Sequence, residues 1–399
     1  MIAWLLGIGL VVTPFILAPG SGNLSREPKM AWAVSFALAI GLTALYKGVL
    51  KPFKNKGALA LVGYALLSFF LSPKPQLALF GIESGRFWSW EPMFYILTFL
   101  LMTVAVSSIG YTKKTLHITF DVMIWCATLM AGLVIIQFLG IDQFFERRFG
   151  TYGHMVGTLG NYTLVGPFLT IVAPLAIYRK KYALMALMVI AAVVTQSDVA
   201  RVGMLAMFAC YFALKNKKRF VSTAVVVYLA VGILGTMYNT SETVRQRFPD
   251  NERFLTAYQS IHDLTTPVME GSKKKYSITG IGIGSFKYLF HAKNNQRNDN
   301  FLYAHNEYVQ VLYEMGIAGF LFFMGMMGLI FRQNTSMKEI FSRGVSNRKR
   351  ALLSSFVGIS VCAAGIFIWQ IGTHIFYTLT IVGLLYNKSV CAKEDICQQ

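Results

Sequence analysis

Residues 280–319 read GIGIGSFKYLFHAKNNQRNDNFLYAHNEYVQVLYEMGIAG. Closely spaced glycines open this stretch, a polar and basic loop follows, and His305 stands almost directly before an apolar segment. This order predicts an ionisable imidazole at the rim of a membrane, facing water but attached to a buried element. Ionisable groups within or beside a membrane are energetically costly and are by default candidates for function. His305 is therefore the first candidate for a catalytic residue.

The composition indicates a polytopic membrane protein. Apolar residues make up 55% of the 399 residues, charged residues only 14%, and the mean hydropathy is +0.52. A soluble domain does not cover that much apolar surface. We therefore expect an all-α fold of about 12 transmembrane helices, each of roughly 20 residues.

The expected helices lie at 2–19, 30–46, 57–71, 93–110, 118–140, 160–178, 182–197, 202–214, 221–237, 306–331, 351–369 and 374–387. The segments at 182–197 and 202–214 are short, so they are either two tilted helices or parts of a hairpin that does not fully cross. Segment 2–19 has no basic region before it and no obvious cleavage site of small residues. We expect it to be a retained first helix.

The net charge of +19 invites a nucleic-acid partner, but the distribution of the charge predicts membrane orientation instead. Every second connector is basic, and this set contains 21 Lys and Arg residues against three acidic ones. The basic connectors are 47–56, 111–117, 179–181, 215–219, 332–350 and the tail after 387. The positive-inside rule places them and both termini in the cytoplasm. We expect a lipid bilayer as the surroundings and no nucleic acid as a partner.

One long polar block, residues 238–305, separates the ninth and tenth apolar segments. It carries nine Lys and Arg residues yet falls on the outer side, because long loops have little weight in the positive-inside rule. It is too short for a separate large domain but long enough to cap a cavity that opens outward. We expect residues 1–399 to form a single integral membrane domain in which 238–305 covers the site.

Four groups near the outer membrane surface are candidates for chemistry: Arg86, Arg201, Arg253 and His305. A guanidinium group offers planar, bidentate donors that suit phosphate oxygens. Histidine is the usual side chain for proton transfer near neutral pH. Several arginines and one histidine beside a membrane suit a lipid pyrophosphate leaving group and a hydroxyl nucleophile.

Each candidate has a purely structural alternative. His305 caps its helix or bonds to a backbone group, and Arg201 pairs with Asp198 at the surface, where such pairs contribute about 0–1 kcal/mol. Arg253 pairs with a neighbouring acid of its loop, and Arg86 extends along the membrane interface. These alternatives remain open at the level of the sequence.

Two acidic residues, Asp121 and Glu314, fall within apolar segments. Each is either a proton or cation site or, more commonly, the partner of a nearby polar side chain. The cysteines do not add a site: Cys126, Cys210 and Cys362 lie in apolar segments, and no cysteine lies in an outer loop. Because zinc spacing, a P-loop and a GxSxG turn are all absent, we expect chemistry without a metal or a cofactor.

The chain resembles the superfamily of bacterial O-antigen ligases and O-antigen polymerases. The strongest similarity is a Gly-x-Gly turn followed by Phe (Gly282, Gly284, Phe286), then His305–Asn306, then Glu-x-Gly-Ile-x-Gly at 314–319. Three weaker similarities follow the same order along the chain. They are a Gly-Asn segment at 157–178 that contains Asn161, an arginine helix start at 197–207, and a loop arginine before a helix at 252–261. Val199 and Ala200 replace the more usual serine before Arg201.

The resemblance implies a GT-C-like helical membrane glycosyltransferase in the bacterial inner membrane. It implies that Arg201 and Arg253, with Arg86 as a further candidate, bind undecaprenyl pyrophosphate. His305 would activate or orient the acceptor hydroxyl, and sugar transfer would invert the anomeric centre without a metal. The supporting residues are Asn306, Asn161, Gly282 and Gly284.

The implied activity is transfer of a glycan from undecaprenyl pyrophosphate to a hydroxyl of the lipid A core on the periplasmic side, in lipopolysaccharide biosynthesis. An O-antigen or exopolysaccharide polymerase and a protein O-oligosaccharyltransferase share the same motifs and are alternatives. A transporter of lipid-linked sugars also fits about twelve spans. However, a transporter needs no long outer block, and the sequence lacks the internal repeats common among transporters.

Overall fold

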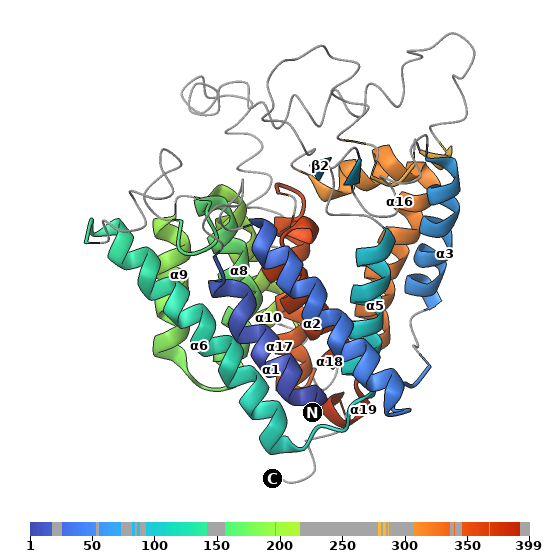
Figure 1. Ribbon diagram of the computed structural model, residues 1–399. Coiled ribbons are helices and arrows are strands. Elements are labelled where there is room, and N and C mark those ends of the chain that lie inside the picture. The colour runs from blue at the N-terminus through green and yellow to red at the C-terminus, as the bar shows by residue number, and fades with distance from the viewer. Residues whose placement is uncertain are drawn as a thin grey trace, which may run out of the picture.

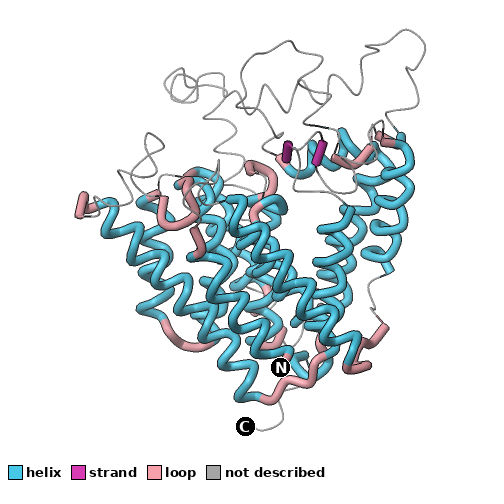
Figure 2. Tube along the Cα trace, in the orientation of Figure 1, coloured by secondary structure: helices cyan, strands magenta, loops and turns pink. Residues whose placement is uncertain are grey.

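The computed structural model is almost entirely helical in the part of the chain that it describes (Figures 1 and 2). The described residues are 1–17, 26–52, 56–72, 82–83, 86–87, 93–141, 156–195, 197–215, 278–280, 282–284, 286, 306–335, 339, 345–366 and 368–391. Among them, the only strands are β1 (Ile82–Glu83) and β2 (Arg86–Phe87), which pair antiparallel with Glu83 opposite Arg86. The expected helical fold is thus confirmed, with one short strand pair that the sequence analysis did not anticipate.

The helices match the predicted apolar segments. They are α1 (Ile2–Phe15), α2 (Arg26–Tyr46), α3 (Lys56–Leu71), α5 (Met93–Ser108), α6 (Lys113–Phe138), α8 (Tyr162–Tyr178), α9 (Tyr182–Val194), α10 (Asp198–Ala213), α16 (Glu307–Asn334), α17 (Asn347–Cys362), α18 (Gly372–Tyr386) and the short α19 (Lys388–Cys391). A single 3-10 turn, η2 (Ile368–Gln370), precedes α18. Every predicted segment coincides with a helix except 221–237, which lies outside the described residues.

Three of the described helices are long and apolar enough to cross a membrane: Pro28–Tyr46, Lys113–Phe138 and Glu307–Asn334. The other apolar helices, including α8, α9 and α18, have between 10 and 17 residues. The two short predicted segments form two separate helices, α9 and α10. The predicted number of spans stays a prediction, and so does the loop 238–305, of which the structure describes only residues near the glycine-rich turn.

The described parts of the basic connectors lie at one end of the bundle, where the N-terminus and α19 also lie (Figure 1). Hydrogen bonds join the ends of these connectors: Lys51 N to Ser108 Oγ (2.9 Å), Tyr111 N to Ser389 Oγ (3.2 Å), Val345 N to Leu214 O (3.0 Å) and Arg348 Nη1 to Val390 O (2.5 Å). The connectors that were grouped by charge therefore also form a group in space. We call this the basic end.

The remaining described connectors meet at the opposite end, which we call the site end. Lys29 Nζ donates to Ile16 O (2.6 Å) across the connector between α1 and α2. Bonds between different segments at this end are Thr158 Oγ1 to Pro14 O (2.6 Å), Thr373 Oγ1 to Thr13 O (2.9 Å), Glu307 N to Ala363 O (2.9 Å) and Cys362 Sγ to Val199 O (3.5 Å). The helices α2, α8, α10, α16 and α18 all begin at this end. Their N-terminal dipoles favour negative charge there.

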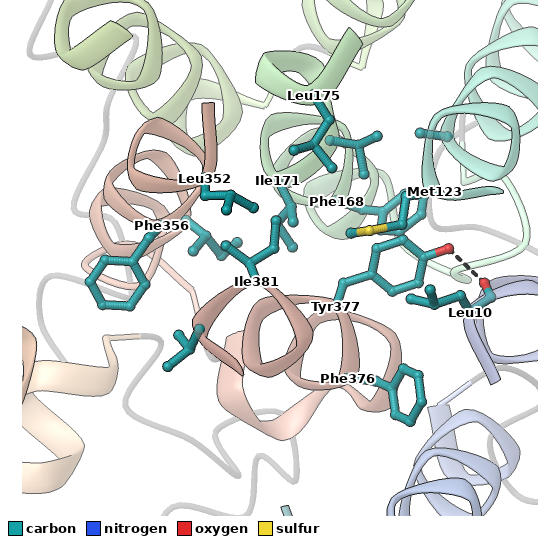
Figure 3. Close-up of a cluster of buried hydrophobic side chains, with 14 of the residues drawn as sticks. Leu10, Met123, Phe168, Ile171, Leu175, Leu352, Phe356, Phe376, Tyr377 and Ile381 are labelled. Carbon is teal, nitrogen blue, oxygen red and sulfur yellow. Dashed lines mark hydrogen bonds between the residues drawn. The ribbon is translucent and has the colours of Figure 1, made fainter. Parts of the chain in front are cut away.

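The core lies among α1, α6, α8, α17 and α18, where large side chains interdigitate (Figure 3). Tyr377 packs its ring against Phe168 and donates its hydroxyl to Leu10 O at 2.6 Å, so its polar atom is satisfied. Glycines allow α10 and α17 to approach closely. A Cβ at Gly203 would lie 2.0 Å from Cys362 Sγ. Small residues at such contacts are typical of helix packing in membranes.

Candidate functional site

Glu314 organises the glycine-rich turn at the site end. Its carboxylate accepts the N–H of Gly284 at 2.8 Å and the N–H of Phe286 at 3.0 Å, and its backbone oxygen accepts the N–H of Gly282 at 2.9 Å. The Phe286 ring then packs edge-on against Tyr313, with centroids 5.0 Å apart. Residues thirty positions apart in the sequence thus form one unit. We call residues 280, 282–284, 286 and 314–316 the glycine–glutamate unit.

The glycines in this unit are required by conformation and by space. Gly280 and Gly316 have φ values of +72° and +66°, a region that L-residues with side chains rarely occupy. A Cβ at Gly280 would lie 2.2 Å from the backbone oxygen of Glu314. Gly316 interrupts the helical φ/ψ values of α16, so the turn packs against a kink. The close packing of the turn against α16 therefore depends on glycine at both Gly280 and Gly316.

The start of α16 is fixed on its other side by α17 and η2. Asn306 caps the helix, since its Oδ1 accepts the N–H groups of Tyr308 at 3.0 Å and Val309 at 3.2 Å. The next residue, Glu307, donates its N–H to Ala363 O and accepts the N–H of Trp369 on Oε1 at 2.8 Å. Asn306, the residue that follows His305, is therefore fixed at the start of α16 by these hydrogen bonds. His305 itself lies outside the described residues.

An apolar cavity of about 220 Å³ lies beside the glycine–glutamate unit, among α3, α5, α16 and α18. Its walls are mainly aliphatic and aromatic, with Leu61, Tyr95, Phe99 and Met326 among them. Three polar residues of α16 also line it: Glu307, Gln310 and Glu314. Their spacing of three and four positions places them on one face of the helix. The cavity therefore combines long apolar walls with one polar strip.

Arg201 lies in the first turn of α10 and is exposed. Its Nη1 is 3.1 Å from Asp198 Oδ1, so the surface pair that was one alternative for this residue is present. Both side chains are about half exposed, and such a pair contributes little to stability. The first turn of α10 and the start of α16 both contact the end of α17, through the Cys362–Val199 and Ala363–Glu307 bonds. Arg201 and Asn306 thus lie at the same end.

The other predicted site residues fall into two groups. Asn161 caps α8, with its Oδ1 accepting from Thr163 N at 2.9 Å and from Thr163 Oγ1 at 2.8 Å. Arg86 is placed only as a backbone position in β2, opposite Glu83. Arg253, like His305, lies outside the described residues. The structure thus brings Asn161, Arg201, Asn306 and the glycines to one end, and their proposed roles stay predictions.

Asp121 pairs with nearby cationic side chains, the more common of the two alternatives stated for it. Its carboxylate accepts two hydrogen bonds from Arg179, each at 3.0 Å, and lies 3.0 Å from Lys181 Nζ, with 29% of its side chain exposed. This ion pair raises the pKa of Arg179 above its usual value. Asp121 is therefore part of a partly exposed ion-pair cluster near the basic end.

The sequence analysis did not predict two buried ionisable side chains at the site end, Lys29 and Glu307. Lys29 is only 1% exposed, and its Nζ donates to Ile16 O. It directly precedes the expected segment 30–46, so hydropathy gives no indication that it is buried. Glu307 is 3% exposed, and the polar spacing from Glu307 through Gln310 to Glu314 was a signal that could have predicted a polar helix face. Within the described residues, no group of three His, Cys, Asp or Glu side chains is arranged to bind a metal.

The fold is that of a helical protein whose apolar helices are typical of integral membrane proteins. A family model described as O-antigen ligase matches residues 183–324, from the start of α9 to the middle of α16. This range includes Arg201 and the whole glycine–glutamate unit. The match confirms the predicted resemblance to the O-antigen ligase superfamily and supports an enzyme of the glycosyltransferase-like ligase and polymerase type. No curated protein matches the chain.

Proposed function

We propose that the protein is an integral membrane glycosyltransferase that moves a glycan from undecaprenyl pyrophosphate to a hydroxyl of the lipid A core. In this proposal residues 1–399 form one membrane domain, with 238–305 above the site on the periplasmic side. The observation that carries the proposal is the glycine–glutamate unit. It joins both halves of the family-like motif and forms part of the wall of the apolar cavity.

The cavity suits the isoprenoid part of such a donor. Its aliphatic and aromatic walls, from Leu61 on α3 to Met326 on α16, match a branched hydrocarbon chain that has no hydrogen-bonding groups. The polar face of α16 gives the cavity a direction, because Glu307 lies at the site end where α16 begins. A polyprenyl chain in the cavity would carry its pyrophosphate toward that end.

The site end suits the pyrophosphate. The N-termini of α8, α10 and α16 lie there, and Asn161, Ser197 and Asn306 cap them. Helix N-termini attract anions, and Arg201 adds a full positive charge at the same end. Arg253 and Arg86 complete the proposed set. An arginine that leaves an exposed pair for a pyrophosphate gives up little, since the pair contributes about 0–1 kcal/mol.

The proposed reaction is a displacement with inversion at the anomeric carbon. The acceptor oxygen forms the new C–O bond while the bond from the sugar to the pyrophosphate breaks. His305 accepts the hydroxyl proton, and undecaprenyl pyrophosphate leaves with the bonding electron pair. The arginines stabilise the negative charge that develops on the leaving group. No metal is assigned a step in this scheme.

The experiment is transfer by the purified protein from a lipid-linked glycan to three separate acceptors: a lipid A core, a second lipid-linked glycan, and a protein. We expect product with the lipid A core and none with the other two. Arg332 is an exposed arginine at the C-terminal end of α16, away from the proposed site. Arg332→Ala is therefore the control for substitution of the site arginine Arg201 and should transfer normally. Elongation of the lipid-linked glycan would make the protein a polymerase, and product on the protein would make it an O-oligosaccharyltransferase. Absence of transfer to all three, with the donor bound, would contradict the proposal.

A further inference from the structure

A second cavity, of about 530 Å³, lies at the basic end among α8, α9, α10 and α17. Three of the residues that line it are cationic: Lys180, Lys215 and Arg350. None of the lining residues that the structure describes is acidic. Lys180 and Lys215 make no ion pair with any described residue, whereas the neighbouring cations Arg179 and Lys181 are paired with Asp121. Among the described residues, the positive charge of the cavity is therefore not compensated by an acid.

Arg350 makes this cavity more than a solvated cluster of lysines. It is only 7% exposed, and its guanidinium carbon lies 4.6 Å from the centroid of the Tyr211 ring. One nitrogen, Nη2, donates to Asn347 Oδ1. The Nε–H is buried and has no acceptor among the described residues. A buried, charged donor without a partner is costly, so it points to an acceptor beyond the described residues, which a bound ligand would supply.

Apart from Asn347, the rest of the described lining is aliphatic or aromatic, and three of the aromatic residues are tyrosines. Phe208 and Phe212 stack on each other with ring centroids 6.4 Å apart, and Met185 faces the same cavity from α9. An apolar wall beside a cluster of positive charges, at the ends of apolar helices, matches a molecule with an anionic head and a hydrocarbon tail. Basic pockets between helices on the cytoplasmic side of membranes bind the head groups of anionic lipids.

We propose that this cavity binds an anionic phospholipid, with the phosphodiester near Arg350, Lys180 and Lys215 and an acyl chain along Met185, Phe208 and Phe212. A guanidinium group suits phosphate oxygens because its donors are planar and paired. The site lies at the end that the positive-inside rule places in the cytoplasm, so the lipid comes from the inner leaflet. The assignment is independent of the glycosyl transfer proposed for the opposite end.

The test uses the purified full-length protein in a neutral detergent. Native mass spectrometry measures the dissociation constant for dioleoyl phosphatidylglycerol, with dioleoyl phosphatidylcholine and inorganic phosphate as the other two arms. We expect phosphatidylglycerol to bind, phosphatidylcholine to bind much more weakly, and inorganic phosphate at equal concentration not to displace the lipid. Comparable binding of the two lipids would overturn the proposal. Displacement by inorganic phosphate would assign the cavity to a soluble phosphate compound and would overturn the lipid assignment.

Substitutions test whether phosphatidylglycerol binds in this cavity. The double variant Lys180→Asn, Lys215→Ala should weaken phosphatidylglycerol binding by roughly 25-fold, from about five-fold for each lysine near an anionic lipid. Asn suits position 180 because Lys180 has a φ of +58°. The control is Lys47→Ala, Lys114→Ala, which removes the same charge from exposed positions outside the cavity and should bind as the wild type does. Arg350→Lys should weaken binding by a smaller factor, because it keeps the charge but loses the planar fork. Equal affinity of the two double variants would overturn the location.

Discussion

At the scale of the residue, Glu314 connects the two halves of the glycine–glutamate unit. Glu314→Ala leaves the buried N–H groups of Gly284 and Phe286 without their acceptor, at about 1–3 kcal/mol each. We expect a clear fall in melting temperature in detergent, and a smaller fall for Glu314→Gln, which retains one acceptor oxygen. Glu339→Ala is the control, because that side chain is 44% exposed and lies 4.0 Å from Lys349. Equal melting of Glu314→Ala and the wild type would show that the turn does not depend on this carboxylate.

His305 is expected to act on the acceptor hydroxyl, which is a poor nucleophile at neutral pH. His305→Ala should lower the rate of glycan transfer by roughly 10²–10⁴-fold, the usual contribution of a general base, with little change in donor binding. A base must be neutral to accept a proton, so the wild-type rate should fall as the pH drops through the imidazole pKa. The variant should lose this dependence. Transfer and melting temperature are measured together, with His117→Ala in α6 as the control. A stable variant with wild-type transfer would contradict a catalytic role, and a loss of stability alone would indicate a structural role other than the helix cap, which Asn306 provides.

Arg201 has two possible partners, Asp198 and a donor pyrophosphate, and substitutions separate them. If the pyrophosphate is the functional partner, Arg201→Ala should greatly reduce transfer, and Arg201→Lys should restore only part of it because an ammonium group lacks the fork. Asp198→Asn should leave transfer intact, since the exposed pair contributes about 0–1 kcal/mol. Transfer is assayed with a purified lipid-linked donor. Full activity of Arg201→Ala would remove this residue from the site.

At the scale of the element, helix packing depends on glycines that admit no side chain. Gly203 in α10 faces Cys362 in α17, and a Cβ there would lie 2.0 Å from the sulfur. Gly203→Val should therefore destabilise the protein by about 1–3 kcal/mol, as overpacking does. Gly325→Val in α16 is the control, because a Cβ at that exposed position would have no atom within 4 Å. Melting temperatures in detergent compare the two, and similar losses would contradict the close contact of α10 and α17.

Among the elements, the helices could be predicted from the sequence, whereas features that depend on contacts between distant residues could not. Hydropathy is a local property, so segment 306–331 corresponds to α16 and segment 57–71 to α3. The glycine run at 280–284 was a weak signal by itself because its partner, Glu314, lies thirty residues further along the chain. The kink at Gly316 had no local signal either, since it depends on contact with that turn. The strand pair β1–β2 is too short for an alternating pattern to reveal it.

Charge and burial were harder to predict for single residues. The sequence places Asp121 inside an apolar segment, yet Arg179 reaches it from the end of α8, a contact that no local pattern specifies. Lys29 shows the opposite error, because a lysine beside a predicted span is normally solvated, whereas here its side chain is only 1% exposed. Such errors arise where tertiary packing decides the surroundings of a charged group.

At the scale of the whole molecule, the described ends of the basic connectors are adjacent in space, and these connectors are also similar in charge. The hydrogen bond from Val345 N to Leu214 O joins two of them across more than a hundred residues. This arrangement agrees with a bundle whose connectors alternate between two ends, as a polytopic membrane protein requires. The sequence groups the connectors by their charge, but it does not predict which of them are in contact.

The prediction at this scale concerns orientation. Reporter fusions after residue 218 and near residue 270 should report opposite sides of the membrane, because the first follows a basic connector and the second lies in the long loop. A fusion after residue 345 should report the same side as the one after 218, since Val345 contacts Leu214. If 218 and 270 report the same side, Arg253 and His305 do not share a compartment with the donor glycan. The proposed chemistry at the start of α16 then loses its substrate, whatever the substitutions at single residues show.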